Sequence, residues 1–76
     1  MGAWSSVDVE IVGSTGVVIV ATRGAAGAGE VLLRHSGGSQ TYLALSEEPI
    51  DKGTTVLVIG NLGGRTVSVI PLSGGN

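Results

Sequence analysis

The sequence contains no cysteine, no phenylalanine and few charged residues. Without cysteine, the chain has no disulfide framework, no thiolate zinc site and no cysteine nucleophile. Aromatic residues make up only 3% of the 76 residues, so the core must be built from valine, leucine and isoleucine. Four basic and six acidic side chains give a net charge of −2, whereas a nucleic-acid interface normally carries a basic patch. The composition therefore argues against a nucleic-acid interface.

Long apolar segments are also missing. The longest apolar run, residues 17–21, has five residues, where a membrane-spanning helix needs roughly 20. The first twelve residues include Asp8 and Glu10 and no basic residue, so they do not resemble a secretory signal. The hydrophobic content of 42% is too high for a disordered chain. We therefore expect one small folded domain, because 76 residues allow no more.

Fourteen glycines separate five runs of residues that favour β-structure. Each run has five or six residues, a typical strand length, and is rich in β-branched or aliphatic side chains. The runs are residues 17–22, 30–35, 40–45, 54–59 and 66–70. A helical period is not sustained over a dozen residues anywhere in the chain. The sequence therefore predicts an all-β fold.

The connections between these runs indicate a closed barrel. Residues 35–39 and 60–65 are short enough to form antiparallel hairpins. Residues 46–52 contain a proline and are too short for an ordinary helix, so we expect a loop or at most one turn there. Residues 22–29 form a flexible Gly/Ala connection. Because five short strands must hide their edges and some runs are apolar on both faces, we predict closure into a small barrel.

The alternation along each strand predicts which side chains fill the barrel. The expected inward set is Val18, Val31, Leu33, Leu43, Leu45, Val56, Val58, Val67 and Val69. A shift of one residue would exchange the two faces of a strand. Tyr42 is expected to half-fill the barrel, with its hydroxyl reaching water.

The chain divides into a barrel and two ends. Residues 13–72 are expected to form the barrel, and residues 73–76 a disordered tail. Residues 1–12 are expected to be an N-terminal extension or an edge strand, because apolar and acidic residues alternate there. The Met1-Gly2 start is compatible with a vector-derived addition.

No motif in the chain carries a recognisable catalytic chemistry. Residues 24–29 and 60–66 resemble phosphate-binding loops, but each is followed by a strand instead of the helix that would hold a phosphate. His35 is the only histidine and is typical of a solvated turn. Glu47 and Glu48 are adjacent and, in an extended segment, point to opposite sides. We therefore predict no catalytic, cofactor-binding or metal-ligating residue, no cofactor and no enzymatic activity.

Two patterns of small and apolar residues resemble the C-terminal domain of NfeD-like proteins. In the second half these are Ile50-x-x-Gly53-x-x-Val56-x-Val58, a Gly-containing hairpin, and Val67-x-Val69-x-Pro71-Leu72. Upstream they are Gly13-x-x-Gly16-x-Val18, Gly29-x-Val31, the Gly37-Gly38 turn and Tyr42-x-Ala44. The match covers roughly residues 12–72. Residues 23–29 depart from the family, because the proline that usually precedes the glycine of this loop is missing.

The resemblance implies a five-stranded OB-fold barrel that lacks the usual helix between its third and fourth strands. It also implies the soluble tail of a membrane-tethered protein, on the cytoplasmic face, that works with stomatin- or flotillin-like membrane scaffolds. On this basis we predict a non-enzymatic protein-interaction module that reaches the membrane only through a part of the protein outside this chain. Self-association is a further expectation. An exposed strand edge, or apolar residues such as Leu57 and Ile59, would provide the contact.

Two alternatives stay open. One is an OB-fold module that binds oligonucleotides or another ligand, although Trp4 and Tyr42 are the only aromatic residues and the chain is acidic. The other is a carrier domain modified on Lys52, the only lysine, which precedes Gly53 in a turn. Lys52 lacks the neighbours that flank the modified lysine of biotinyl and lipoyl domains.

Overall fold

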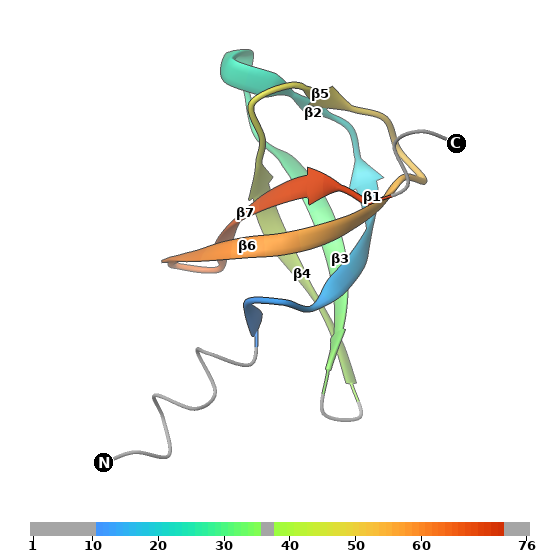
Figure 1. Cartoon of the computed structure of the whole chain (residues 1–76), viewed down its shortest axis with the longest axis vertical. Helices are drawn as coiled ribbons and strands as arrows, with labels where there is room; N and C mark the ends of the chain where they lie inside the picture. Colours follow the sequence, from blue (N-terminus) through green and yellow to red (C-terminus); the bar gives the residue numbers. More distant parts are fainter. Residues whose placement is uncertain (1–10, 36–37, 73–76) are drawn as a thin grey trace.

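Five strands close into a barrel in the order β1-β3-β4-β7-β6, with β6 returning to β1. The structure is a computed structural model, which describes residues 11–35 and 38–72 (Figure 1). The barrel strands are β1 (Thr15–Val20), β3 (Gly29–His35), β4 (Gly38–Leu45), β6 (Thr55–Gly63) and β7 (Thr66–Pro71). The remaining elements are β2 (Thr22–Arg23), the 3-10 turn η1 (Gly24–Ala26) and β5 (Pro49–Ile50).

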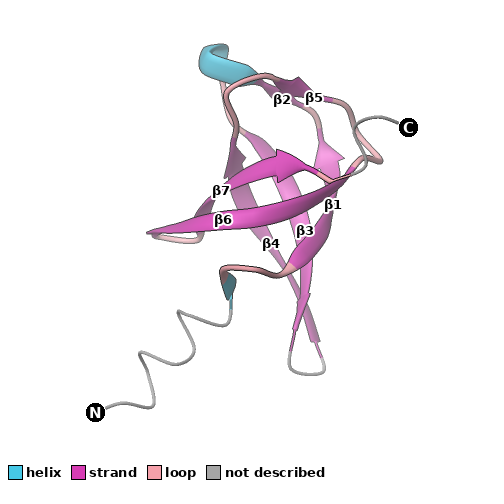
Figure 2. Cartoon of the chain, viewed as in Figure 1, coloured by secondary structure: helices cyan, strands magenta, loops and turns pink. Residues whose placement is uncertain are grey.

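The pairing of these strands is that of an OB-fold barrel. All neighbours are antiparallel except β4 and β7, which run parallel over three residue pairs. Between β4 and β6 the chain forms only turns and the two-residue β5 (Figure 2). The predicted fold class, an all-β OB-like barrel without a helix at this point, is therefore confirmed.

Strand β1 pairs with β3 along one edge and with β6 along the other, and one glycine takes part in both pairings. Gly16 pairs with Leu33 of β3 on one side and with Val56 of β6 on the other. A Cβ atom at Gly16 would lie 2.6 Å from the backbone oxygen of Leu32. Glycine at a barrel corner permits such a close approach. The absence of a side chain at position 16 therefore lets β1 pass close to β3 while it also pairs with β6.

The core is aliphatic except for one tyrosine. Its buried apolar residues are Ile11, Val18, Val31, Leu33, Tyr42, Ala44, Ile50, Val56, Val58, Val67 and Val69. Val31, Leu33, Val56 and Val67 are fully buried. These positions agree with the predicted inward set on β1, β3, β6 and β7.

The prediction for β4 was wrong. Leu43 and Leu45 are 46% and 39% exposed, whereas Tyr42 and Ala44 face the core. The expected five-residue connection would have placed Leu43 opposite Val31. Instead His35 pairs with Gly38, which leaves two residues between the strands and brings Tyr42 opposite Val31. Since directly opposed residues share a face, this change of register exchanges the two faces of β4.

Tyr42 is more deeply buried than the sequence indicated. Its side chain is 7% exposed, and its hydroxyl donates a hydrogen bond to Gln40 Oε1 at 3.3 Å. A buried tyrosine hydroxyl normally finds such a partner. The one large aromatic ring of the described chain is therefore part of the core.

The short β2–β5 ladder ties together two connections that the sequence predicted as loops. Thr22 pairs with Ile50, and Arg23 pairs with Pro49. Thr22 is 2% exposed, and its Oγ1 accepts a hydrogen bond from the Ile50 backbone N–H at 2.9 Å. The same oxygen lies 2.7 Å from Ser46 Oγ. This buried hydroxyl therefore holds the β1–β3 connection against the β4–β6 connection.

We expect Thr22→Val to destabilise the domain by about 1–3 kcal/mol, because the buried Ile50 N–H loses its acceptor while the shape of the side chain is kept. Urea denaturation of both proteins measures the difference. Thr41→Val is the matched control, since Thr41 is exposed on β4, and we expect it to change the stability by less than about 0.5 kcal/mol. Equal effects of the two variants would contradict the role assigned to Thr22.

The predicted division of the chain is only partly covered by the structure. Residues 1–10 and 73–76, on which the expected edge strand and tail fall, lie outside the described residues. Ile11 and Val12 are described and belong to no strand. Ile11 is 5% exposed and joins the core. The described part of the barrel therefore begins with a core residue ahead of β1.

Candidate interaction surface

Many large apolar side chains remain exposed on the outside of the barrel. They are Val12, Val17, Val20, Leu43, Leu45, Ile59, Leu62, Ile70 and Leu72, each at least 39% exposed. Single exposed apolar residues are common, whereas a cluster marks a surface that can bind. The location of these residues relative to one another is therefore the relevant observation.

Three of these side chains line one groove of about 530 Å³, which we call the β7 groove. Its lining consists of Leu45, Ser46, Glu47, Glu48, Ile59, Ser68, Val69, Ile70 and Pro71. These residues come from the end of β4, the β4–β5 connection, β6 and β7. The groove therefore lies where the parallel β4–β7 ladder ends.

Ile59 lies on this surface at an irregularity in the β6–β7 pairing. Val58 pairs with Val69 and Gly60 pairs with Ser68, so Ile59 is the extra residue of a β-bulge. Val56 and Val58 are buried, so the alternation of β6 already directs Ile59 to the outer face. Ile59 is 49% exposed. Of the two apolar residues expected to stay outside the core, Ile59 is exposed and Leu57 is half-buried.

One small lining residue of the β7 groove, Ser68, lies between β4 and β6. Ser68 pairs with Leu45 of β4 on one side and with Gly60 of β6 on the other. Even a Cβ atom at Gly60 would be 3.6 Å from the Cβ atom of Ser68. Ser68 and the glycine opposite it therefore add little side-chain volume beside the groove.

The charged groups of the β7 groove are all acidic. Glu47 and Glu48 are its only charged lining residues, and both are exposed. The Ser46 hydroxyl donates a hydrogen bond to the Glu48 backbone oxygen at 2.7 Å, which fixes the connection beside the groove. Among the described residues, no basic side chain forms an ion pair with either carboxylate. The two negative charges are therefore not neutralised within the described chain.

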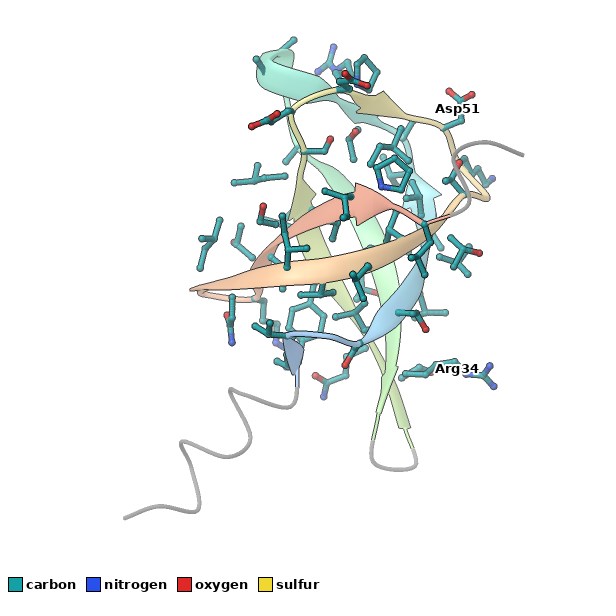
Figure 3. All side chains as sticks on the ribbon, viewed as in Figure 1. Arg34 and Asp51 are labelled. Atoms are coloured by element: carbon teal, nitrogen blue, oxygen red, sulfur yellow. The ribbon has the colours of Figure 1, made fainter. Side chains whose placement is uncertain are left out.

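Another, smaller hollow lies on the outer face of β1 and β3. It measures about 440 Å³ and is lined by Thr15, Gly16, Val17, Leu32, Arg34, Ser39 and Thr55. Val17 pairs directly with Leu32, and Arg34 projects outward from β3 (Figure 3). OB-folds that bind oligonucleotides use the face of their second and third barrel strands, here β3 and β4, and need aromatic side chains and positive charge there. Here the lining offers one arginine and no aromatic ring.

The other motifs considered in the sequence form ordinary connections. Residues 60–66 are part of the β6–β7 hairpin, in which Gly64 and Arg65 both have a positive φ, of 59° and 57°. Residues 24–26 form η1, and residues 27–28 lead from it into β3. His35 ends β3, opposite Gly38. Lys52 lies in the turn between β5 and β6, which belong to different sheets, so it does not lie at a hairpin tip.

Within the described ranges 11–35 and 38–72, no group of three or more histidine or acidic side chains could hold a metal ion. The same residues include no helix that is long and apolar enough to cross a membrane.

Comparison with known proteins identifies the family. The family model of the NfeD C-terminal domain matches residues 15–70, from the start of β1 to the penultimate residue of β7. The chain belongs to the NfeD C-terminal domain family. No curated protein matches it significantly.

Two solved structures resemble this NfeD domain. The soluble domain of the NfeD protein YuaF from Bacillus subtilis is 33% identical, with a TM-score of 0.71. The match covers 92% of this chain and 87% of the YuaF chain. The C-terminal domain of stomatin operon partner protein 1510-C from Pyrococcus horikoshii is 24% identical, with a TM-score of 0.66. That match covers 86% of this chain and 92% of the other.

Proposed function

We propose that this NfeD domain is a non-enzymatic protein-interaction module whose partner is a stomatin- or flotillin-like membrane scaffold. The observation that carries the proposal is the β7 groove, where Leu45, Ile59 and Ile70 remain exposed although the barrel core is already filled. Apolar clusters of this kind are typical of protein-binding surfaces. The name of the Pyrococcus relative, a stomatin operon partner protein, supports this choice of partner.

The proposal includes a location for the domain. We propose that it is the soluble tail of a membrane-tethered protein and that it faces the cytoplasm. The described residues contribute no membrane-spanning helix of their own. Tethering would then depend on a part of the protein outside this chain, and it would keep the domain close to a membrane-bound partner. A high effective concentration lets a tethered domain use a weak contact.

The test is binding between the isolated 76-residue chain and a stomatin-like protein from the same cell. We expect saturable binding in the micromolar range by isothermal titration calorimetry, which corresponds to about −8 kcal/mol. An unrelated membrane protein from that cell is the control. The proposal fails if the chain does not bind the stomatin-like protein and deletion of the domain leaves the localisation of that protein unchanged.

An oligonucleotide-binding role is disfavoured by the outer face of β1 and β3, where Arg34 is the only charged lining residue of the hollow. Fluorescence anisotropy with labelled single strands at low salt tests it directly, and saturable micromolar binding would reverse our preference. Sedimentation over a range of concentrations tests the expected self-association in the same samples.

A further inference from the structure

We propose that the β7 groove binds a basic amphipathic helix of the protein partner. Apolar side chains of the helix would contact Leu45, Ile59 and Ile70, and its lysine or arginine residues would pair with Glu47 and Glu48. This inference rests on the proposed function and deepens it, because it names the surface and the chemistry of the segment that the surface binds.

The apolar part of the groove consists of exposed aliphatic side chains that a partner can cover. Leu45, Ile59 and Ile70 are 39%, 49% and 42% exposed, and they line the groove together with the small residue Ser68. A helix that packs into such a groove presents apolar residues at positions i, i+3 or i+4 and i+7. Covering these three side chains would remove apolar surface from water, which favours binding by about 25 cal/mol per Å².

Charge selects among the possible occupants. The carboxylates of Glu47 and Glu48 are the only charges that line the groove. An anionic membrane surface would be repelled by them, whereas lysine and arginine would be attracted. The N-terminal residues of this chain are an unsuitable occupant, because residues 1–10 contain Asp8 and Glu10 and no basic residue. The groove therefore favours a cationic segment from another protein.

The strand edge beside the groove favours binding through side chains. The β4–β7 ladder ends at Leu45 and Ser68, so residues 69–71 of β7 pair with β6 only. Addition of a partner strand at this free edge would use the backbone N–H groups of β7. Pro71 has no N–H group, and proline is one of the residues that protect an edge from further pairing. A helix, which needs no backbone pairing, fits this edge better than a strand.

The probe for a direct test is a synthetic helical peptide of about 14 residues, with leucine at the spacing of one helix face and lysine elsewhere. We expect saturable NMR shifts at Leu45, Ile59 and Ile70 of the isotope-labelled 76-residue chain. A peptide with the same leucines and glutamate in place of lysine should bind at least about tenfold more weakly, a difference of 1.4 kcal/mol. A lysine–serine peptide without leucine should not bind. Equal binding of the lysine and glutamate peptides, or shifts confined to the β1–β3 hollow, would overturn the proposal.

Variants of the chain separate the charge effect from the apolar effect. We expect Glu47→Lys and Glu48→Lys each to weaken binding of the leucine–lysine peptide severalfold. Asp51→Lys makes the same charge change on the β5–β6 turn, outside the lining of the groove, and should change the affinity less than twofold (Figure 3). Ile70→Ser should weaken binding about tenfold, whereas Val17→Ser, at the exposed hollow on β1, should have little effect.

The same variants distinguish failure of this inference from failure of the proposed function. If the stomatin-like protein binds the wild-type chain and Glu47→Lys, Glu48→Lys and Ile70→Ser equally well, the function stands and the groove is not its site. If the peptide binds in the groove and the stomatin-like protein does not bind, the groove stands and the partner class is wrong. Peptide-independent, concentration-dependent shifts at Ile59 and Ile70 would show that a second copy occupies the groove, and would overturn the proposal.

Discussion

Gly29→Ala is expected to destabilise the barrel by about 3 kcal/mol or more, the upper part of the range for overpacked cores. Gly29 is the first residue of β3 and lies opposite Ala44. A Cβ atom there would overlap the backbone oxygen of Val20 and lie 2.7 Å from the carbonyl group of Ala21. These are backbone atoms, so a change of side-chain rotamer cannot relieve the overlap. A domain of this size has a total stability of roughly 4–11 kcal/mol, so the variant should lose a large part of it.

Gly60→Ala is the matched control for this variant. Gly60 also lies in a strand without a positive φ, but a Cβ atom there would make only an ordinary contact with Ser68. Alanine is usually the better residue in a strand by roughly 0.5–1 kcal/mol when it meets no clash. Urea denaturation followed by circular dichroism measures both variants. If Gly29→Ala were as stable as Gly60→Ala, the close approach of β1 and β3 would be refuted.

Leu33→Ala is expected to cost about 3 kcal/mol, because the side chain is fully buried and its removal leaves a cavity beside Gly16 of β1. Leu43→Ala should cost less than about 1 kcal/mol, since Leu43 is exposed on β4. The two substitutions remove the same atoms from neighbouring strands, so they form a matched pair. Thermal denaturation of both variants checks the prediction. A large effect of Leu43→Ala would support the original assignment of β4 faces and contradict the observed register.

The barrel itself could be predicted from the sequence because its signal is repeated along the chain. β-Branched runs near 17–22, 54–59 and 66–70 alternate with glycines and have the length of strands. Hairpins at 35–39 and 60–65 then allow few arrangements of five strands. The family resemblance indicated the same OB-like barrel. Patterning of this kind determines the fold class but does not determine register.

The faces of β4 could not be predicted because they depend on the number of residues in one hairpin connection. An odd number of connecting residues, such as the expected five, places Leu43 opposite Val31. An even number, such as the observed two, places Tyr42 there. Both Tyr42-x-Ala44 and Leu43-x-Leu45 are compatible with burial, so hydrophobicity alone does not decide between them. Alternation along β3, read together with a two-residue connection, would have given the observed faces.

The candidate surface was only partly predicted from the sequence. Ile59 was expected outside the core and is exposed, whereas Leu45 was assigned to the core because the register of β4 was wrong. Ile70 follows the alternation of β7 and could have been found from it. Thr22 and Ile50 were missed because their ladder joins residues 28 apart, through a single buried hydroxyl. Such long-range contacts carry no periodic signal.

The position of β7 in the barrel has a consequence for synthesis of the domain. β7 is the last strand of the described residues, yet it pairs with both β6 and β4 and so closes the ring. The β3–β4 hairpin can form while later residues are still being translated, because its contacts are local. This hairpin lies between β1 and β7 in the barrel. The barrel therefore cannot close until residue 71 has left the ribosome. During that interval Leu33, Tyr42 and Val58 lack their full set of neighbours, so early termination before β7 yields a chain prone to aggregation.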